Sequence, residues 1–198
     1  MARMRAAQRR RQLLDVAARV FARHGYRGTT TAELAAAAGI SEPILYRHFR
    51  NKLHMFTSLI QDVGDRVLES LGSQIQRASS AEDELDALVT ALLADASPNH
   101  IDSRLIIQAL NQQDSEGAIR ASVRRHVAAL HRLIQGELTS LQKRGAIRAD
   151  VTPAGMAWFL VDLGLGARLL VALKGRKGDR TTGARSQAAL VRRSLAPA

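Results

Sequence analysis

The stretch GISEPILYRHFRNK, residues 39–52, decides the fold because it combines a turn, a helix start and an unusual set of polar side chains. Gly39 suits a tight turn, Ser41 is a natural N-cap, and Pro43 lies in the first turn, where no helical N–H partner is needed. The helix that follows is very short and has few apolar side chains, so it is unstable alone and must be held by neighbouring helices. We therefore expect this helix to be inserted into a binding partner.

Two helices are expected before this stretch. Residues 8–24 carry an apolar stripe at helical spacing, which ends at Gly25. The next segment, TTTAELAAAAG, opens with Thr30 and has Glu33 three residues later, which is the spacing of a capping box. Two short helices joined by a tight turn form a helix-turn-helix, which here covers residues 31–50.

Several side chains of the third helix are polar and are expected to project outwards. Its N-terminal face is narrow enough for the major groove of DNA, where each base pair presents a distinct pattern of donors and acceptors. Arg47 can donate paired hydrogen bonds to guanine, Glu42 can accept one from cytosine N4, and Ile44 can contact a thymine methyl. The alternative is a polar surface helix without a partner.

The charge distribution favours the DNA-binding interpretation. The chain has a net charge of +11, but residues 1–56 carry 11 Lys and Arg against 3 Asp and Glu, which gives +8. Residues 57–114 carry 3 against 10, which gives −7, and residues 115–198 carry 15 against 5, which gives +10. A basic N-terminal part followed by an acidic segment is typical of a domain that binds a polyanion, joined to a body with another role.

The rest of the chain is expected to be helical. Hydrophobic residues make up 46% of the sequence and aromatic residues only 4%, a mixture that favours helix over strand. A fourth helix is expected at about residues 52–75, and another begins at Ser80. Further helices are expected at about residues 101–112, 116–144 and 183–195. We therefore expect an all-α protein with a DNA-binding domain at residues 8–67 and a larger regulatory and dimerisation domain at residues 68–198.

The segment TPAGMAWFLVDLGLGARLLVALKG, which starts at Thr152, is apolar on nearly every side. Such a run is long enough to span a membrane. Asp162 and Arg168 lie near its middle, however, where a charge is costly in lipid. We favour a helix that is buried on several faces, partly by a second subunit.

The N-terminal part resembles the DNA-binding domain of the tetracycline-repressor (TetR) family of bacterial transcriptional regulators. The features that carry the resemblance are Ala17, Phe21, Gly25, the Thr30-Thr31 pair, Leu34-Ala35, AGIS at 38–41, LYRHF at 45–49 and Asn51-Lys52. Leu53 departs from the family pattern, which often has an acid after the lysine. The remaining chain is similar to the family only in length and in its helical character.

The resemblance implies a set of DNA contacts. Thr31, with its neighbour Thr30, Tyr46 and Lys52 would contact phosphates, for which a lysine ammonium group is well suited. The side chains expected in or beside the major groove are Ser41, Glu42, Pro43, Ile44, Arg47 and His48. It also implies a cytoplasmic homodimer that dimerises through its C-terminal helices, binds a palindromic operator and is released from it by a small-molecule ligand, most simply as a repressor. The residues that could line a ligand cavity are Arg104, Gln108, His126, Met156 and Trp158.

Three other interpretations remain open at this point: a regulator without a small-molecule ligand, a nonspecific architectural DNA-binding protein, and a helical enzyme. The chain has no cysteine, its histidines lack metal-ligand spacing, and no nucleophile–base pair is suggested by spacing. We therefore expect neither an enzyme, nor a metal site, nor a cofactor. The basic N-terminus is not followed by an apolar segment typical of an export signal.

Overall fold

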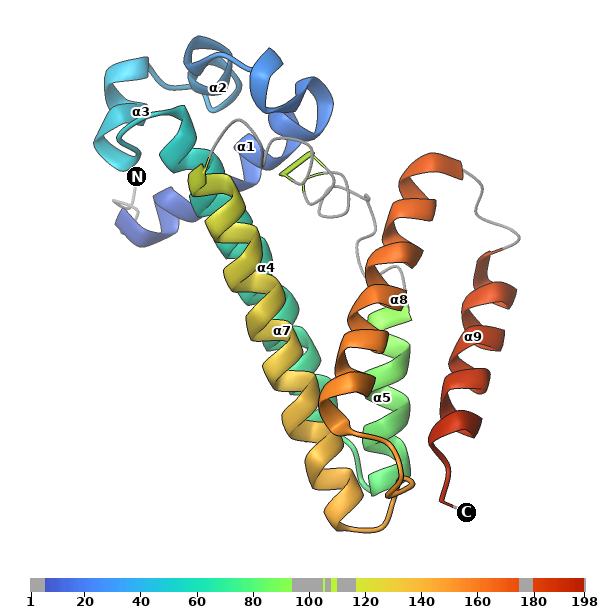
Figure 1. Ribbon diagram of the computed structural model, residues 1–198. Coiled ribbons are helices and arrows are strands. Elements are labelled where there is room, and N and C mark those ends of the chain that lie inside the picture. Colours follow the sequence, from blue (N-terminus) through green and yellow to red (C-terminus); the bar gives the residue numbers. More distant parts are fainter. Residues whose placement is uncertain (1–5, 94–104, 106–107, 110–116, 175–179, 198) are drawn as a thin grey trace. The chain divides into compact units, whose positions relative to one another are not determined.

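The computed structural model describes residues 6–93, 105, 108–109, 117–174 and 180–197. These residues form α-helices and no strand (Figure 1), so the all-α prediction is confirmed for them. The helices are α1 (Ala6–Gly28), α2 (Thr31–Ala37), α3 (Glu42–His48), α4 (Lys52–Gln76), α5 (Ala81–Leu93), α7 (Gly117–Lys143), α8 (Pro153–Lys174) and α9 (Arg180–Leu195).

The chain divides into two compact units, which are described separately. The N-terminal unit comprises residues 1–64 and 101–124, and the C-terminal unit comprises residues 65–100 and 125–198. The first unit ends close to the domain boundary that we expect after residue 67. It also includes residues 101–124, which the sequence alone assigns to the second domain. The helix expected at about 101–112 lies outside the described residues apart from Leu105, Gln108 and Ala109, which are helical.

The core of the N-terminal unit is built around three aromatic rings. Phe21 of α1 and Phe56 of α4 are fully buried and meet edge to face, with ring centroids 4.9 Å apart. The ring of Tyr26 lies 5.0 Å from that of Phe56. Leu34 of α2 and Leu45 of α3 are also buried in this unit, so both short helices are held through their apolar sides.

The core of the C-terminal unit joins α5, α7, α8 and α9 with the second half of α4, and α5 packs against both α8 and α9 (Figure 1). Two ion pairs cross its surface: Glu84 of α5 with Arg144 at the end of α7, and Asp86 of α5 with Arg192 of α9. The fully buried side chains in this core include Leu88, Val89, Ile134, Leu138, Ala157, Leu160 and Leu195.

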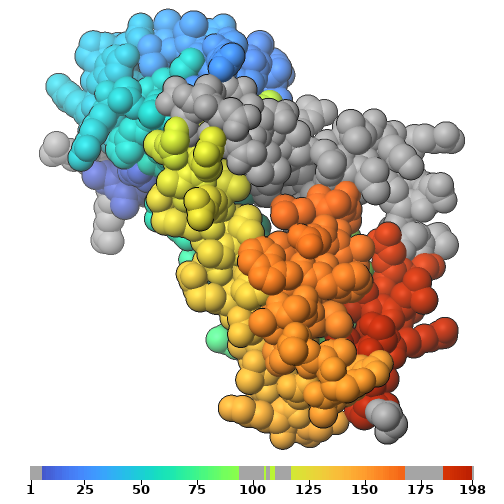
Figure 2. Space-filling view, viewed as in Figure 1, coloured from blue at the N-terminus to red at the C-terminus, as the bar shows by residue number. Residues whose placement is uncertain are grey.

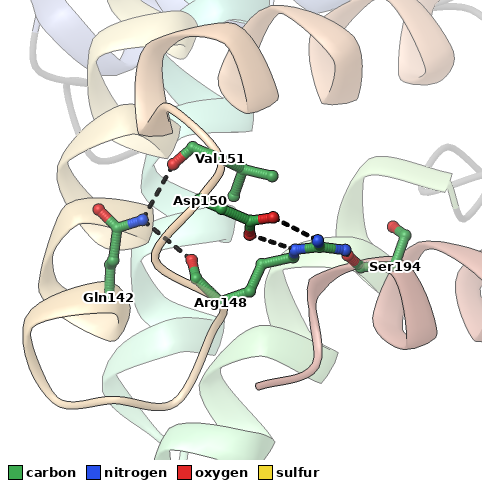
Figure 3. A network of polar contacts seen from close by, with 5 residues as sticks. All are labelled: Gln142, Arg148, Asp150, Val151 and Ser194. Carbon is green, nitrogen blue, oxygen red and sulfur yellow. Dashed lines mark hydrogen bonds and ion pairs between the residues drawn. The ribbon is translucent and has the colours of Figure 1, made fainter. Parts of the chain in front are cut away.

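A polar network attaches the segment between α7 and α8 to the end of α9 (Figure 3). The Gln142 side-chain amide donates to the carbonyl oxygens of Arg148 (3.0 Å) and Val151 (2.9 Å), which closes this segment. The Arg148 guanidinium pairs with Asp150 and also donates to the carbonyl oxygen of Ser194 at 3.4 Å. The backbone N–H of Arg148 donates to the carbonyl oxygen of Leu195 at 3.0 Å. The last turn of α9 is therefore held in place by backbone as well as side-chain contacts.

Helix α8 is buried on one side and exposed on another, although its sequence is apolar on nearly every side. Ala157, Leu160 and Val161 are buried, whereas Trp158 and Phe159 are 46% and 49% exposed. In the part of the chain that the structure describes, no helix has the length and apolar character needed to cross a membrane.

Candidate nucleic-acid interface

The start of α2 is closed by the capping box that the spacing of Thr30 and Glu33 predicts. The Thr30 hydroxyl accepts a hydrogen bond from the Glu33 N–H at 3.2 Å, and the Glu33 carboxylate accepts one from the Thr30 N–H at 2.8 Å. The Glu33 carboxylate accepts hydrogen bonds from the Thr30 N–H and from the Thr30 hydroxyl, the latter at 3.1 Å, and both hold the pKa of the Glu33 carboxyl below its ordinary value. The backbone around Thr30 and Thr31 is therefore set locally, before any contact with DNA.

The turn between α2 and α3 depends on a glycine. Gly39 has a φ of 64°, a backbone conformation that residues other than glycine rarely adopt. The N–H of Ile40 donates to the carbonyl oxygen of Ala35, and that of Gly39 donates to the carbonyl oxygen of Ala36, both at 3.1 Å. This pattern is a Schellman motif, which ends α2 and directs the chain into α3.

Helix α3 presents most of its surface to solvent. Among its residues only Leu45 is fully buried, at 2% exposure. Ser41 occupies the N-cap position as predicted, but its hydroxyl makes no capping hydrogen bond, which differs from what its residue type suggests. Pro43, Ile44, Tyr46 and Arg47 are exposed, and Glu42 and His48 are partly buried. The structure thus brings all the predicted groove-facing residues together on one short helix and its N-cap.

Two charged side chains of α3 have no partner within the described residues. Glu42 and Arg47 make no hydrogen bond or ion pair there, although each can form strong ones. Ile44, a large apolar residue, is 39% exposed on the same short helix. Charged and apolar groups left uncommitted on one helix are suited to bind base edges, where donors, acceptors and methyl groups alternate.

The predicted phosphate contacts lie at the edges of this helix. Tyr46 of α3 donates from its hydroxyl to the Thr31 hydroxyl of α2 at 3.3 Å, which ties the two short helices together. Lys52, the first residue of α4, donates from Nζ to the carbonyl oxygen of Thr29 at 2.8 Å, and its ammonium lies 4.7 Å from the centroid of the Tyr26 ring. Lys52 thus also connects α4 to the junction between α1 and α2, a contact that sequence spacing does not reveal.

A second group of side chains, none of them among the predicted DNA contacts, surrounds the turn from α3 to α4. The Asn51 side chain accepts a hydrogen bond from the His54 N–H at 2.7 Å, and His54 Nδ1 accepts one from the Arg50 N–H at 3.1 Å. Burial and the nearby charges of Arg50 and Arg10 lower the pKa of His54. A neutral imidazole is required for this hydrogen bond, because a protonated Nδ1 cannot accept one.

The residues expected to line a ligand cavity are divided between the two units of the chain. Arg104 lies outside the described residues. Gln108 belongs to the N-terminal unit, where its amide donates to the carbonyl oxygen of Ala22 at 3.3 Å. His126, Met156 and Trp158 belong to the C-terminal unit. The Trp158 ring is exposed and stacks on His131 with centroids 4.3 Å apart, so it lies at the surface of this chain.

The comparisons with known proteins agree with this geometry. Residues 13–59 match the family model described as bacterial regulatory proteins, tetR family. The chain is 30% identical over 117 residues to the HTH-type transcriptional activator FasR of Mycolicibacterium smegmatis, covering 59% of this chain and 52% of that protein. It is 29% identical over 147 residues to the HTH-type transcriptional repressor KstR2 of Rhodococcus jostii, covering 72% of this chain and 70% of that protein.

A solved structure shares the fold over nearly the whole length. The transcriptional regulator FadR of Bacillus subtilis, in complex with stearoyl-CoA, superposes with a TM-score of 0.79 at 18% identity, covering 93% of this chain and 98% of that one. The chain therefore has a helix-turn-helix DNA-binding domain at its N-terminus, which is followed by a larger helical body. Residues 13–59 therefore match the tetR family of bacterial regulatory proteins, and the chain is similar to transcriptional regulators.

Proposed function

We propose that this protein is a sequence-specific regulator that binds a palindromic operator through α3. The observation that carries the proposal is the uncommitted surface of α3, on which Glu42, Ile44 and Arg47 are free to contact base edges. Thr31, Tyr46 and Lys52 are placed at its edges, where hydroxyl and ammonium groups can bind phosphate oxygens. Binding of this kind is expected to occur in the cytoplasm, where a bacterial chromosome lies.

The proposal is tested by selecting bound duplexes from a random pool and measuring the affinity of the enriched duplex against a random duplex at matched salt. Specific binders prefer their site by a factor of about 10³ or more over nonspecific DNA. Enrichment of an inverted repeat with such a preference is the expected result. Equal affinity for both duplexes would instead identify a nonspecific architectural DNA-binding protein.

We further propose that the protein is a homodimer and that α8 and α9 form the interface. Trp158 and Phe159 of α8 are about half exposed, and Leu190 of α9 is 65% exposed. Figure 2 shows both helices, α8 in orange and α9 in red, at the surface of the C-terminal unit. A second subunit that covers these large apolar side chains would remove their exposed surface from water. A dimer also places two α3 helices on the two half-sites of a palindrome.

The body is proposed to bind a small-molecule ligand that releases the operator. FadR of Bacillus subtilis binds stearoyl-CoA in its solved structure, which supports a ligand for a body of the same fold. Gln108, which the sequence assigns to the regulatory domain and the structure groups with the N-terminal unit, has a buried carbonyl oxygen to which no described residue donates a hydrogen bond, and its amide donates to α1 of the same unit. A ligand group that donates to this oxygen would reach a side chain already connected to α1.

Release requires that the ligand prefer the body conformation that DNA disfavours. A metabolite screen by thermal shift, followed by operator binding with each hit, tests this point. The ligand should raise the melting temperature and lower operator affinity in the same concentration range. A compound that stabilises the protein and leaves operator affinity unchanged is not the effector, and a body that no metabolite stabilises would favour a regulator without a ligand. Relatives named as an activator and as a repressor both occur. We propose that this protein is a repressor, because a ligand that releases it from the operator would then simply relieve repression.

A further inference from the structure

Arg10 of α1 reaches across the N-terminal unit to the C-terminal end of α3. Its guanidinium donates to the Ser58 hydroxyl of α4 at 2.9 Å, in a partly buried contact. The centre of the guanidinium lies 4.9 Å from the centroid of the Phe49 ring, which is within the range of a cation–π contact. Phe49 is the C-cap of α3 and is 2% exposed. One side chain thus connects α1, the end of α3 and α4.

Phe49 helps to fix the orientation of α3 against the rest of the N-terminal unit. The helix has seven residues and only one fully buried side chain, Leu45, so its own packing is small. Phe49 has an extended backbone conformation, and its N–H donates to the carbonyl oxygen of Leu45 at 3.0 Å. Its buried ring is therefore the second point, after Leu45, that holds this short helix against the rest of the unit. A tilt about Leu45 would displace every side chain on the exposed face of α3.

We propose that Arg10 is a positioning residue for DNA recognition, which fixes the C-terminal end of α3 through Phe49 and does not itself bind DNA. This inference rests on the proposed sequence-specific function. An arginine suits the role because its planar guanidinium can cover an aromatic ring and donate a hydrogen bond in the same geometry. A lysine keeps the charge but lacks the flat surface and the fork of donors. The alternative role for a basic residue in this position is a phosphate contact, which would depend on charge alone.

The neighbouring arginine provides a matched control. Arg9 lies on the same helix, and within the described residues it donates only to the Gln12 side chain, at 3.3 Å on the exposed surface. His54 provides an internal reporter, because the positive charge of Arg10 is one of the causes that lower its pKa. We therefore compare Arg10→Lys, Arg10→Met and Arg9→Met in the full-length protein.

Each variant is titrated with the duplex most enriched from a random pool and with a random duplex, across a salt series, and the pKa of His54 is followed by NMR. Both Arg10 variants should lose about tenfold of the preference for the enriched duplex, the size expected from one cation–π contact and one hydrogen bond. Their salt slopes should equal that of the wild type, because no phosphate contact is removed. The pKa of His54 should rise in Arg10→Met, whereas Arg9→Met should keep both the preference and the His54 pKa.

Each of the following results would overturn the inference. Arg10→Lys with a wild-type preference, together with a salt slope reduced by about one in Arg10→Met, would make Arg10 a phosphate contact. A loss of affinity by the same factor on both duplexes would leave the preference for the enriched duplex unchanged. This result would mean that the substitutions only reduce the folded fraction of the protein, which lowers both affinities alike. If the wild-type protein prefers no sequence, the proposed function fails and the role of Arg10 fails with it. A wild type that does discriminate, beside an Arg10→Lys variant that discriminates equally well, removes only the role of Arg10.

Discussion

Replacing Phe159 with alanine should dissociate the dimer without unfolding the subunit. Phe159 is 49% exposed on α8 and lies next to Trp158, which is 46% exposed, so truncating it removes surface area and not core packing. Leu165 on the same helix is a poorer choice, because it is partly buried against the core of the C-terminal unit. Truncating that side chain would mix dissociation with loss of stability.

The size of the effect follows from the exposed area. An aromatic side chain buries about 200 Å² when fully covered, so the exposed half of Phe159 offers about 100 Å² for each subunit. At ~25 cal/mol per Å², two copies contribute ~5 kcal/mol to the dimer. Ordering of side chains at an interface reduces the net value. We therefore expect the dimer to lose about 3 kcal/mol of its free energy of association, which raises the dimer dissociation constant about a hundredfold.

Sedimentation velocity across a concentration series measures this constant, and fluorescence provides an independent signal. Trp158 is the only tryptophan, so its emission should shift to shorter wavelength as the dimer forms. Gly136→Glu is a suitable control, since it places a new charge on an exposed position of α7 where an added Cβ meets no neighbour. A wild-type protein that remains monomeric at micromolar concentration, or a control that dissociates as strongly as Phe159→Ala, would refute the proposed interface.

Three further predictions concern the DNA-binding domain. Arg47→Ala should cost ~1–3 kcal/mol on the operator and less on random DNA, and an equal loss on both duplexes would rule out base recognition by Arg47. Lys52→Met should weaken binding to both duplexes alike and reduce the salt slope by about one. It should also lower the melting temperature, because the hydrogen bond to Thr29 is lost, and an unchanged melting temperature would contradict this structural role. Because the folded pKa of Glu33 is lowered, its stabilising effect is complete above the ordinary pKa of a glutamate and is lost as the pH falls through the folded pKa. Glu33→Gln should therefore flatten the acid limb of the curve of stability against pH, and a curve that keeps the slope of the wild type would show that the contact with Thr30 does not stabilise the fold.

The features that the sequence predicts well are those encoded within a few residues. Thr30 and Glu33 specify a capping box that forms as expected, and Gly39 adopts the positive φ that the turn requires. Gly25 interrupts α1 with non-helical dihedral angles at the predicted stop, even though helical residues continue to Gly28. Helix α4 begins at Lys52, directly after Asn51, as expected. Each of these predictions depends on residues at most four positions apart, and over so short a distance the backbone has few alternative conformations.

The features that the sequence does not predict depend on contacts between distant residues. The hydrogen bond from Arg10 to Ser58 spans 48 positions, and that from Lys52 to Thr29 spans 23. Before folding, each of these side chains is one basic residue among many in a basic segment. Ser41 shows the same limit in a different way, because its residue type favours a capping hydrogen bond that it does not make. Which polar atoms are used within the protein and which stay free is decided by tertiary packing.

The use of these polar atoms separates the residues that hold α3 from those proposed to contact bases. Arg10, Tyr46 and Lys52 each use a donor inside the protein, on Ser58, Thr31 and Thr29 respectively. Glu42 and Arg47 use none within the described residues. A side chain that is fixed by one bond in the protein can still offer its remaining hydrogen-bonding capacity to phosphate oxygens, which are the same at every base pair, whereas a hydrated charged group that faces the bases can form a charge-assisted bond with the matching base. A wrong base leaves that group desolvated and unpaired, which costs free energy. Discrimination between sequences should therefore be concentrated in Glu42 and Arg47, while substitutions at Tyr46 and Lys52 should change affinity for all duplexes with little effect on the preference among them.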